Sequence, residues 1–285
     1  MLLVLLLLSI AGYSQLPGSK SGFIKAKSLS IYYETTGKGT PVFLLHAGLQ
    51  NNRMWDQQVP ALAKTHQVIT LDLPAHGKTT GWDTTFVMAD ILKAVMDSLK
   101  IAKASFVGLS FGAVCATDIA LKYPDRVSKL VFVAPGLLGW DKFIIMDSVS
   151  KPKLDSLDAV FKRKDMVRRS ETFTQTWCDG PFRKPDEVNK NVRNYIYNTT
   201  LENLRAHEDD YWPRFANAKA AETINSIKIP VLIIVGDKDI PLINNTCSFL
   251  KNNIRDARMI TIPNVAHMLN MEQVLPFNKA LTTFL

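Results

Sequence analysis

The sequence predicts an α/β fold, in which a mostly parallel sheet is flanked by helices and carries a helical insert. Several apolar runs are continuous rather than alternating, as strands buried on both faces of a parallel sheet require. Segments with helical spacing separate these runs, and the pattern disappears between residues 137 and 223 before it returns. The chain has 285 residues, of which 47% are hydrophobic, enough to bury one large core. We therefore expect one main domain with an insert.

The expected elements of the first half follow one another in a regular order. Residues 23–37 (FIKAKSLSIYYETTG) predict two short strands, with glycines marking the turn that follows. Four continuous apolar runs come next: PVFLLHAG (41–48), QVITLDLPAHG (67–77), ASFVGLSFG (104–112) and KLVFVAPG (129–136). Helices are expected in residues 86–100 and 112–124, the second ending before Pro124. Strands and helices that alternate in this way imply right-handed crossovers.

The second half begins with a stretch that has no strand pattern. It is polar and charged with scattered aromatic residues, and it predicts helices. The sheet pattern returns in IPVLIIVGDKD (229–239) and ARMITIPNVAH (257–267). The expected division is a leader at residues 1–15, the first part of the core at 22–136, a helical cap insert at 137–223 and the second part of the core at 224–285.

The N-terminus predicts export. MLLVLLLLSIA precedes small and polar residues, which is typical of a secretory signal peptide, here cleaved after Ser14 or Gln15. A bilayer span needs about 20 apolar residues, so this segment is too short to cross a membrane. We expect a periplasmic or secreted protein that is not inserted in a membrane after removal of the leader, with an uncleaved anchor as the alternative.

Composition excludes several other classes of function. The formal net charge is +8, but acidic residues interrupt the densest basic stretch, Lys151 to Arg169, so we expect a solvated helix face and no nucleic-acid partner. Three cysteines are too few and too far apart for a disulfide framework, and we expect them to be packing residues. No ligand spacing such as H-E-x-x-H is present, so no metal or other cofactor is expected.

One short motif nominates a nucleophile. Gly108-Leu109-Ser110-Phe111-Gly112 matches G-x-S-x-G where a predicted strand gives way to a helix. Such a junction holds the serine on a sharp turn, and small flanking residues avoid collisions with neighbouring backbone. The amide of Phe111, at the start of the helix, is then a candidate oxyanion-hole donor. The alternative is that Ser110 only caps the helix.

With this motif in its context, the chain resembles the α/β-hydrolase superfamily from about Gly22 to the C-terminus. The resemblance implies that an acid and then a histidine follow the nucleophile in the chain. Asp237 and Asp239 follow a buried strand, and the family's G-x-x-D spacing favours Asp239; both are turn residues on the alternative interpretation. His267, in a loop after the last predicted strand, is the expected base.

The remaining histidines are assigned to other roles. His46 in LLHAGL resembles the HG motif of the oxyanion loop, with alanine in place of its glycine. The resemblance makes the Gly48 amide the second oxyanion donor, with Leu49 as the fallback. Asp72 and His76 in DLPAHGKT resemble a structural turn of the family, and His66 and His207 are expected at the surface.

A serine at position 110 favours acyl transfer, because family members that form their ester on an aspartate carry that residue at this turn. Ser110 would attack a carbonyl, with His267 as general base and Asp239 orienting it. The region after His46 looks like that of enol-lactonases and carboxylesterases, so we expect a small-molecule ester or lactone substrate. Leu49 and Trp177, in TWCDGPF, are expected to line its pocket, or Trp177 to anchor the cap instead. Three alternatives are C–C bond hydrolysis, perhydrolysis by the same residues, and ligand binding with negligible turnover.

Overall fold

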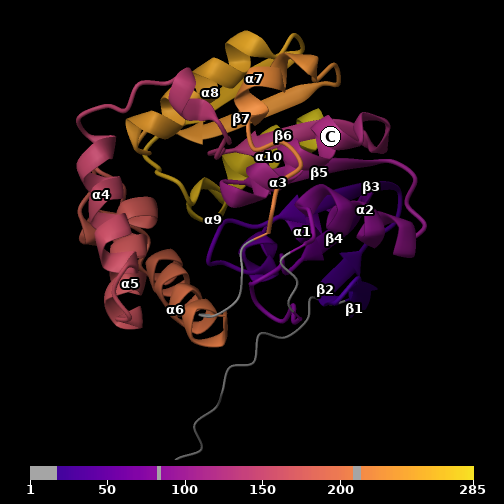
Figure 1. Ribbon diagram of the computed structural model, residues 1–285, viewed down its shortest axis with the longest axis horizontal. Helices are drawn as coiled ribbons and strands as arrows, with labels where there is room; N and C mark the ends of the chain where they lie inside the picture. Colours follow the sequence, from indigo (N-terminus) through magenta and orange to yellow (C-terminus); the bar gives the residue numbers. More distant parts are fainter. Residues whose placement is uncertain (1–17, 82–84, 208–212) are drawn as a thin grey trace, which may run out of the picture.

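The computed structural model describes residues 18–81, 85–207 and 213–285, and these form a sheet flanked by helices (Figure 1). The strands are ordered β1-β2-β4-β3-β5-β6-β7-β8 in space. They are β1 (Lys20–Ala26), β2 (Leu29–Thr36), β3 (Thr40–Leu45), β4 (His66–Leu71), β5 (Ala104–Leu109), β6 (Val127–Val133), β7 (Val231–Gly236) and β8 (Ala257–Ile262). β2 pairs antiparallel with β1 and β4, and all other pairs are parallel. The predicted α/β fold class is confirmed.

Ten α-helices accompany the strands in the described residues. They are α1 (Val59–Leu62), α2 (Met88–Ser98), α3 (Phe111–Lys122), α4 (Ser150–Phe161), α5 (Met166–Phe173), α6 (Lys190–His207), α7 (Ala220–Thr223), α8 (Pro241–Asn253), α9 (Leu269–Glu272) and α10 (Val274–Phe284). A π-helix, Thr174–Asp179, continues directly from α5. α3 ends before Pro124, as its sequence predicts, because proline cannot donate the next backbone hydrogen bond.

The core lies along the central strands. Every residue of β5 and β7 is buried, which is why both are continuous apolar runs in the sequence. The rings of Phe43 and Phe106, on the adjacent strands β3 and β5, stack with centroids 5.0 Å apart. α3 packs on β3, β5 and β6, and α8 packs on β7 and β8. Cys115, Cys178 and Cys247 are buried and unpaired within this packing.

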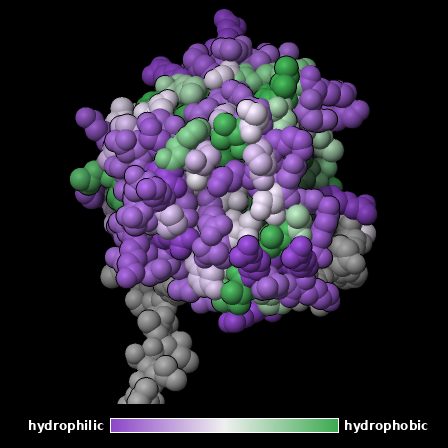
Figure 2. Space-filling view, turned by 90° about the vertical axis from the view of Figure 1, so that its left-hand side faces the viewer, coloured by the Kyte–Doolittle hydropathy of each residue, from purple (hydrophilic) through white to green (hydrophobic). Residues whose placement is uncertain are grey.

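The cap, defined as α4, α5, the π-helix and α6 together with the residues that connect them, lies beside the sheet (Figure 1). It connects β6 to β7, and its surface in Figure 2 is mostly hydrophilic with separate hydrophobic spots. The residues after it return to the core, since α7 contacts α3 and the amide of Asn217 donates to Asp118 Oδ1 at 3.1 Å. The cap is therefore an insert that leaves the core after β6 and returns to it before β7.

The expected leader, residues 1–15, lies outside the described residues, so export and signal cleavage stay predictions. In the described segments, none of the helices is both long and apolar enough to cross a membrane.

Candidate active site

Ser110 occupies the turn between β5 and α3 in an uncommon backbone conformation. Its φ is 54° and its ψ is −109°, a region that residues with a side chain rarely adopt. Four backbone hydrogen bonds hold this conformation. The Ser110 amide donates to Val133 O at 3.0 Å, and its carbonyl accepts from the amides of Ala113, Val114 and Gly136 at 3.0, 3.3 and 3.2 Å. The strand-to-helix turn is thus fixed from both sides.

The two glycines that flank Ser110 allow close approach of backbone. A Cβ at Gly108 would lie 2.2 Å from the carbonyl oxygen of Gly112, and a Cβ at Gly112 would lie 2.1 Å from that of Leu45. Neither distance is possible for a real side chain. The motif therefore seats the start of α3 directly against the end of β3, where the loop with Gly48 begins.

Asp239 and His267 meet beside this turn. His267 Nδ1 lies 2.7 Å from Asp239 Oδ2, and both side chains are almost completely buried. The other carboxylate oxygen of Asp239 accepts the Ile240 amide at 2.8 Å. Asp237 instead is half-exposed, with Lys238 Nζ 3.5 Å from its carboxylate. The structure thus brings Asp239, and not Asp237, to the histidine.

Bonding to Asp239 sets the tautomer of His267. The Nδ1 proton is donated to the carboxylate, which leaves the lone pair of the neutral ring on Nε2. Nε2 is buried and has no hydrogen-bond partner among the described residues. His267 and Ser110 both line one cavity of about 490 Å³. A proton acceptor and a hydroxyl therefore border the same space.

Apolar side chains form most of the wall of this cavity. The side chains that line it with Ser110 and His267 come from the core and the cap: Ala47, Leu49, Phe111, Val114, Leu154, Leu157, Asp158, Phe161, Phe173 and Trp177, with Gly48 and Gly136. Leu154, Leu157 and Phe161 share one face of α4. Sequence analysis missed them, although their spacing of three and four residues within the basic stretch is an amphipathic signal.

The structure separates the two candidates for the second oxyanion donor. The amide of Leu49 donates to His76 Nε2 at 2.9 Å, so it is already occupied. The Gly48 amide makes no hydrogen bond to the described residues, and Gly48 lines the cavity. Phe111 lines it too, as the first residue of α3, where backbone N–H groups have no acceptor within the helix. Gly48 and Phe111 remain the candidate pair.

Two buried histidines support the loop that carries Gly48. His46 donates from Nδ1 to Ala47 O at 2.7 Å and accepts the Leu73 amide on Nε2 at 2.9 Å. Burial and the nearby His76 lower the pKa of His46 well below its ordinary value, so the ring is neutral. His76 Nδ1 donates to Pro74 O at 2.9 Å. These rings join the loop after β3 to the loop after β4, and neither lines the cavity.

Asp72 supports the same loops. Its carboxylate accepts the amides of Asn52 and Lys78, each at 2.8 Å. Burial raises the pKa of Asp72 to about 6 despite these two bonds. Its contacts connect backbone segments and reach no part of the cavity.

The expectation for His66 is wrong. His66 is buried at the start of β4, where its ring bonds to Thr65 Oγ1 at 2.9 Å, because an isolated polar residue next to an apolar run can begin the strand. His207 is half-buried, with Nε2 2.9 Å from Gly77 O.

Trp177 both lines the cavity and contacts the core, and its part in substrate binding stays a prediction. It lies in the π-helix and lines the cavity, and its ring centroid is 4.5 Å from that of His267. Its carbonyl oxygen accepts the backbone amide of His267 at 3.3 Å. The cap thus touches the histidine directly.

In the described part of the chain, no group of three or more His, Cys, Asp or Glu side chains is arranged to hold a metal ion.

The sequence is similar to a known family of proteins and to several hydrolases. The model of the alpha/beta hydrolase fold family matches residues 40–274. A 2-hydroxy-6-oxo-6-phenylhexa-2,4-dienoate hydrolase of Burkholderia cepacia is 27% identical over 94% of this chain and 96% of its own length. A 2-hydroxy-6-oxononadienedioate/2-hydroxy-6-oxononatrienedioate hydrolase of Paraburkholderia phymatum is 28% identical over 90% of this chain and 91% of its own.

Solved structures agree on the fold. The structure titled Est816 as an N-acyl homoserine lactone degrading enzyme superposes with a TM-score of 0.75 at 24% identity, covering 92% of this chain and all of its own. Identity at this level shows the fold only. With the family match over residues 40–274, the chain belongs to the α/β-hydrolase family.

Proposed function

We propose that this protein is a serine hydrolase that cleaves a small, uncharged ester or lactone. One observation carries the proposal: Ser110 and His267, whose ring is bonded to Asp239, line the same mostly apolar cavity. A serine hydroxyl is a weak nucleophile at neutral pH and needs a base to accept its proton. An imidazole whose Nδ1 is bonded to a carboxylate, and whose Nε2 has no hydrogen-bond partner in the described part of the chain, is such a base.

The proposed reaction has two stages. Ser110 Oγ attacks the carbonyl carbon while its proton moves to His267 Nε2, and the resulting oxyanion accepts hydrogen bonds from the Gly48 and Phe111 amides. The alcohol leaves with the proton of His267, and an acyl ester remains on Ser110. Water, deprotonated by the same Nε2, then attacks this ester and releases the carboxylic acid and the free serine.

The cavity favours an uncharged acyl group. No Lys or Arg is among the described residues that line it. The residues outside the described part of the chain contain neither type. Asp158 is exposed and pairs with Lys162 at 2.5 Å. An anionic substrate would therefore meet mostly apolar walls, and the described residues that line them include no Lys or Arg to offset its desolvation.

Labelling with a fluorophosphonate tests the nucleophile. We expect the wild-type protein to react and Ser110→Ala to remain unlabelled, because the probe bonds to an activated serine. A panel of p-nitrophenyl esters of increasing acyl length, together with lactones, then identifies the substrate class. Equal labelling of the two proteins, or no labelling of the wild type, would rule out Ser110 as an activated nucleophile.

C–C bond hydrolysis on the same residues is the second candidate. The full-length relatives named above support it, because they are hydrolases of dienoates. The mostly apolar lining of the cavity argues against C–C bond hydrolysis, because a dienoate carries a carboxylate and the described lining residues include no Lys or Arg to pair with it. Parallel assays of p-nitrophenyl butyrate and a 2-hydroxy-6-oxo-dienoate separate the two: faster cleavage of the dienoate would replace our proposal. Stabilisation by ligand without turnover would favour a binding protein.

A further inference from the structure

Arg183 has a saturated set of hydrogen bonds between the cap and the core. A guanidinium has five N–H groups, and all five of Arg183 donate to oxygen atoms. Nε bonds to Asp179 O at 3.1 Å, and Nη2 bonds to Cys178 O at 2.6 Å. Nη1 bonds to Asn264 O at 3.3 Å. The two remaining N–H groups bond to Glu272, at 2.9 and 3.0 Å, in a bidentate pair.

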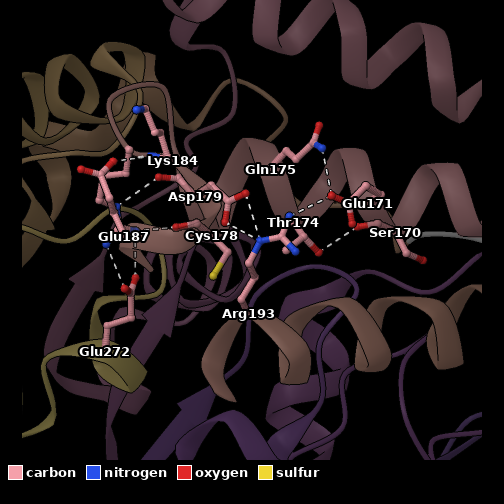
Figure 3. A network of polar contacts seen from close by, with 11 residues as sticks. Ser170, Glu171, Thr174, Gln175, Cys178, Asp179, Lys184, Glu187, Arg193 and Glu272 are labelled. Carbon is pink, nitrogen blue, oxygen red and sulfur yellow. Dashed lines mark hydrogen bonds and ion pairs between the residues drawn. The ribbon is translucent and has the colours of Figure 1, made fainter. Parts of the chain in front are cut away.

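These bonds join the π-helix to both ends of the loop that holds His267. The carbonyls of Cys178 and Asp179 lie at the C-terminal end of the π-helix, where a cation is favourable. Asn264 precedes His267 by three residues and Glu272, the last residue of α9, follows it by five. One guanidinium thus closes the loop of the proposed base. Figure 3 shows Glu272 close to the end of the π-helix, near Cys178 and Asp179.

Gly180, which directly follows the last residue of the π-helix, lies against the two loops that carry Asp239 and His267. Its φ is +76°, and a Cβ there would lie 2.7 Å from Lys238 O and 2.9 Å from Ala266 Cβ. Lys238 and Ala266 are the neighbours of the acid and the base in the chain. A glycine at this position lets the cap rest directly on the backbone of the site.

From this geometry we infer that Arg183 and Glu272 form a clamp that positions the His267 ring for proton transfer. The inference rests on the proposed function, in which His267 is the base. The side chains are only 8% and 7% exposed, so the pair is shielded from water. Bidentate pairing restricts direction as well as distance. Arg183 and Glu272 are therefore positioning residues, which act through the loop and not on the substrate.

Arg193 offers a matched control inside the cap. Its Nε lies 2.9 Å from Asp179 Oδ1 and its Nη2 lies 2.8 Å from Glu171 Oε1 (Figure 3). It is also a largely buried arginine with two carboxylate partners, but both of these carboxylates belong to the cap. Loss of Arg193 weakens the cap, whereas loss of Arg183 in addition releases the His267 loop.

The test compares four variants with the wild type: Arg183→Ala, Arg183→Lys, Glu272→Gln and Arg193→Ala. Circular dichroism checks folding, and fluorophosphonate titration counts active sites so that kcat refers to functional enzyme. The activity-independent readout is the low-field proton NMR signal of His267 Nδ1–H, which is bonded to Asp239. If the wild type hydrolyses none of the substrates, the proposed function fails, and this signal still decides the positioning role.

We expect Arg183→Ala and Glu272→Gln to lower kcat about 100-fold with a smaller change in KM, because a base displaced by about 1 Å costs this much. Their Nδ1–H signal should shift or broaden. Arg183→Lys should fold but recover little kcat, since an ammonium cannot supply the five donors. Arg193→Ala should keep both kcat and signal. Should Arg183→Ala fail to fold, Arg183→Lys and Glu272→Gln decide. Wild-type kcat and signal in the folded clamp variants, or equal losses in Arg193→Ala, would overturn the inference.

Discussion

Replacement of Asp239 by asparagine tests the proposed proton relay most directly. Asparagine has the same shape, and its oxygen can still accept the Ile240 amide. Its NH₂ group then faces His267 Nδ1, which must become the acceptor. The ring proton moves to Nε2, and Nε2 can no longer take the proton of Ser110.

The size of the effect follows from the lost charge. The carboxylate is bonded to Nδ1 at 2.7 Å. In the proposed reaction it would stabilise the imidazolium that forms in the transition state. For charges about 4 Å apart and an effective dielectric constant of about 20, that attraction is about 4 kcal/mol. Each 1.4 kcal/mol is a factor of about ten in rate, so kcat/KM should fall about 1,000-fold.

The assay is the initial rate on the best p-nitrophenyl ester, and Asp237→Asn is the matched control. Asp237 lies two residues away and is half-exposed, and its carboxylate lies 3.5 Å from Lys238 Nζ. We expect Asp237→Asn to keep the wild-type rate, because removing an exposed charge alters little. A similar loss in both variants, or a loss in Asp239→Asn smaller than about tenfold, would refute this account of the relay.

Three further predictions follow from the packing. Gly112→Ala forces α3 away from β3, because its Cβ would lie 2.1 Å from a backbone oxygen, so kcat should fall about 100-fold. Gly22→Ala, where the new Cβ meets an aromatic ring at 3.3 Å, should keep full activity. Equal rates in the two variants would contradict this prediction. The lowered pKa of His46 means that the unfolded chain binds a proton that the folded protein does not, so the free energy of unfolding should fall from pH 7 to 5, by up to about 1.4 kcal/mol per pH unit. Urea titrations should show that the free energy of unfolding of His46→Gln falls less between pH 7 and 5 than that of the wild type. The same pH dependence in both proteins would refute this assignment to His46. Burial raises the pKa of all three cysteine thiols, so an aromatic disulfide reagent should modify none in the native protein and all in denaturant; rapid native reaction would contradict this.

The sheet could be predicted because burial on both faces leaves a direct mark on composition. β5 and β7 are buried at every position, and both are unbroken apolar runs in the sequence. The turn at Ser110 was predictable for a related reason, since only glycine fits at positions 108 and 112. Constraints that leave a mark within one segment, such as an unbroken apolar run or a glycine on each side of a serine, are therefore the ones that sequence reveals.

The choice among polar residues needed information of another kind. Asp237 and Asp239 have the same local setting in sequence, and only the spacing known from related proteins favoured Asp239. The contact that distinguishes them, between Asp239 and His267, joins residues 28 positions apart. Likewise, the occupation of the Leu49 amide by His76 depends on two loops meeting after the fold is complete. No pattern within one segment reports such contacts.

The cap shows the same limit and divides into two parts with different physical roles. α4 presents Leu154, Leu157 and Phe161 to the cavity, which sequence cannot distinguish from a helix face packed on the core. At the other end, Arg183 reaches a carboxylate 89 residues further along the chain. Because α4 lines the cavity and Arg183 contacts the loop of His267, we expect that side chains on α4 can change without moving His267. In the proposed reaction, acyl selectivity and proton transfer would therefore depend on separate contacts of one insert.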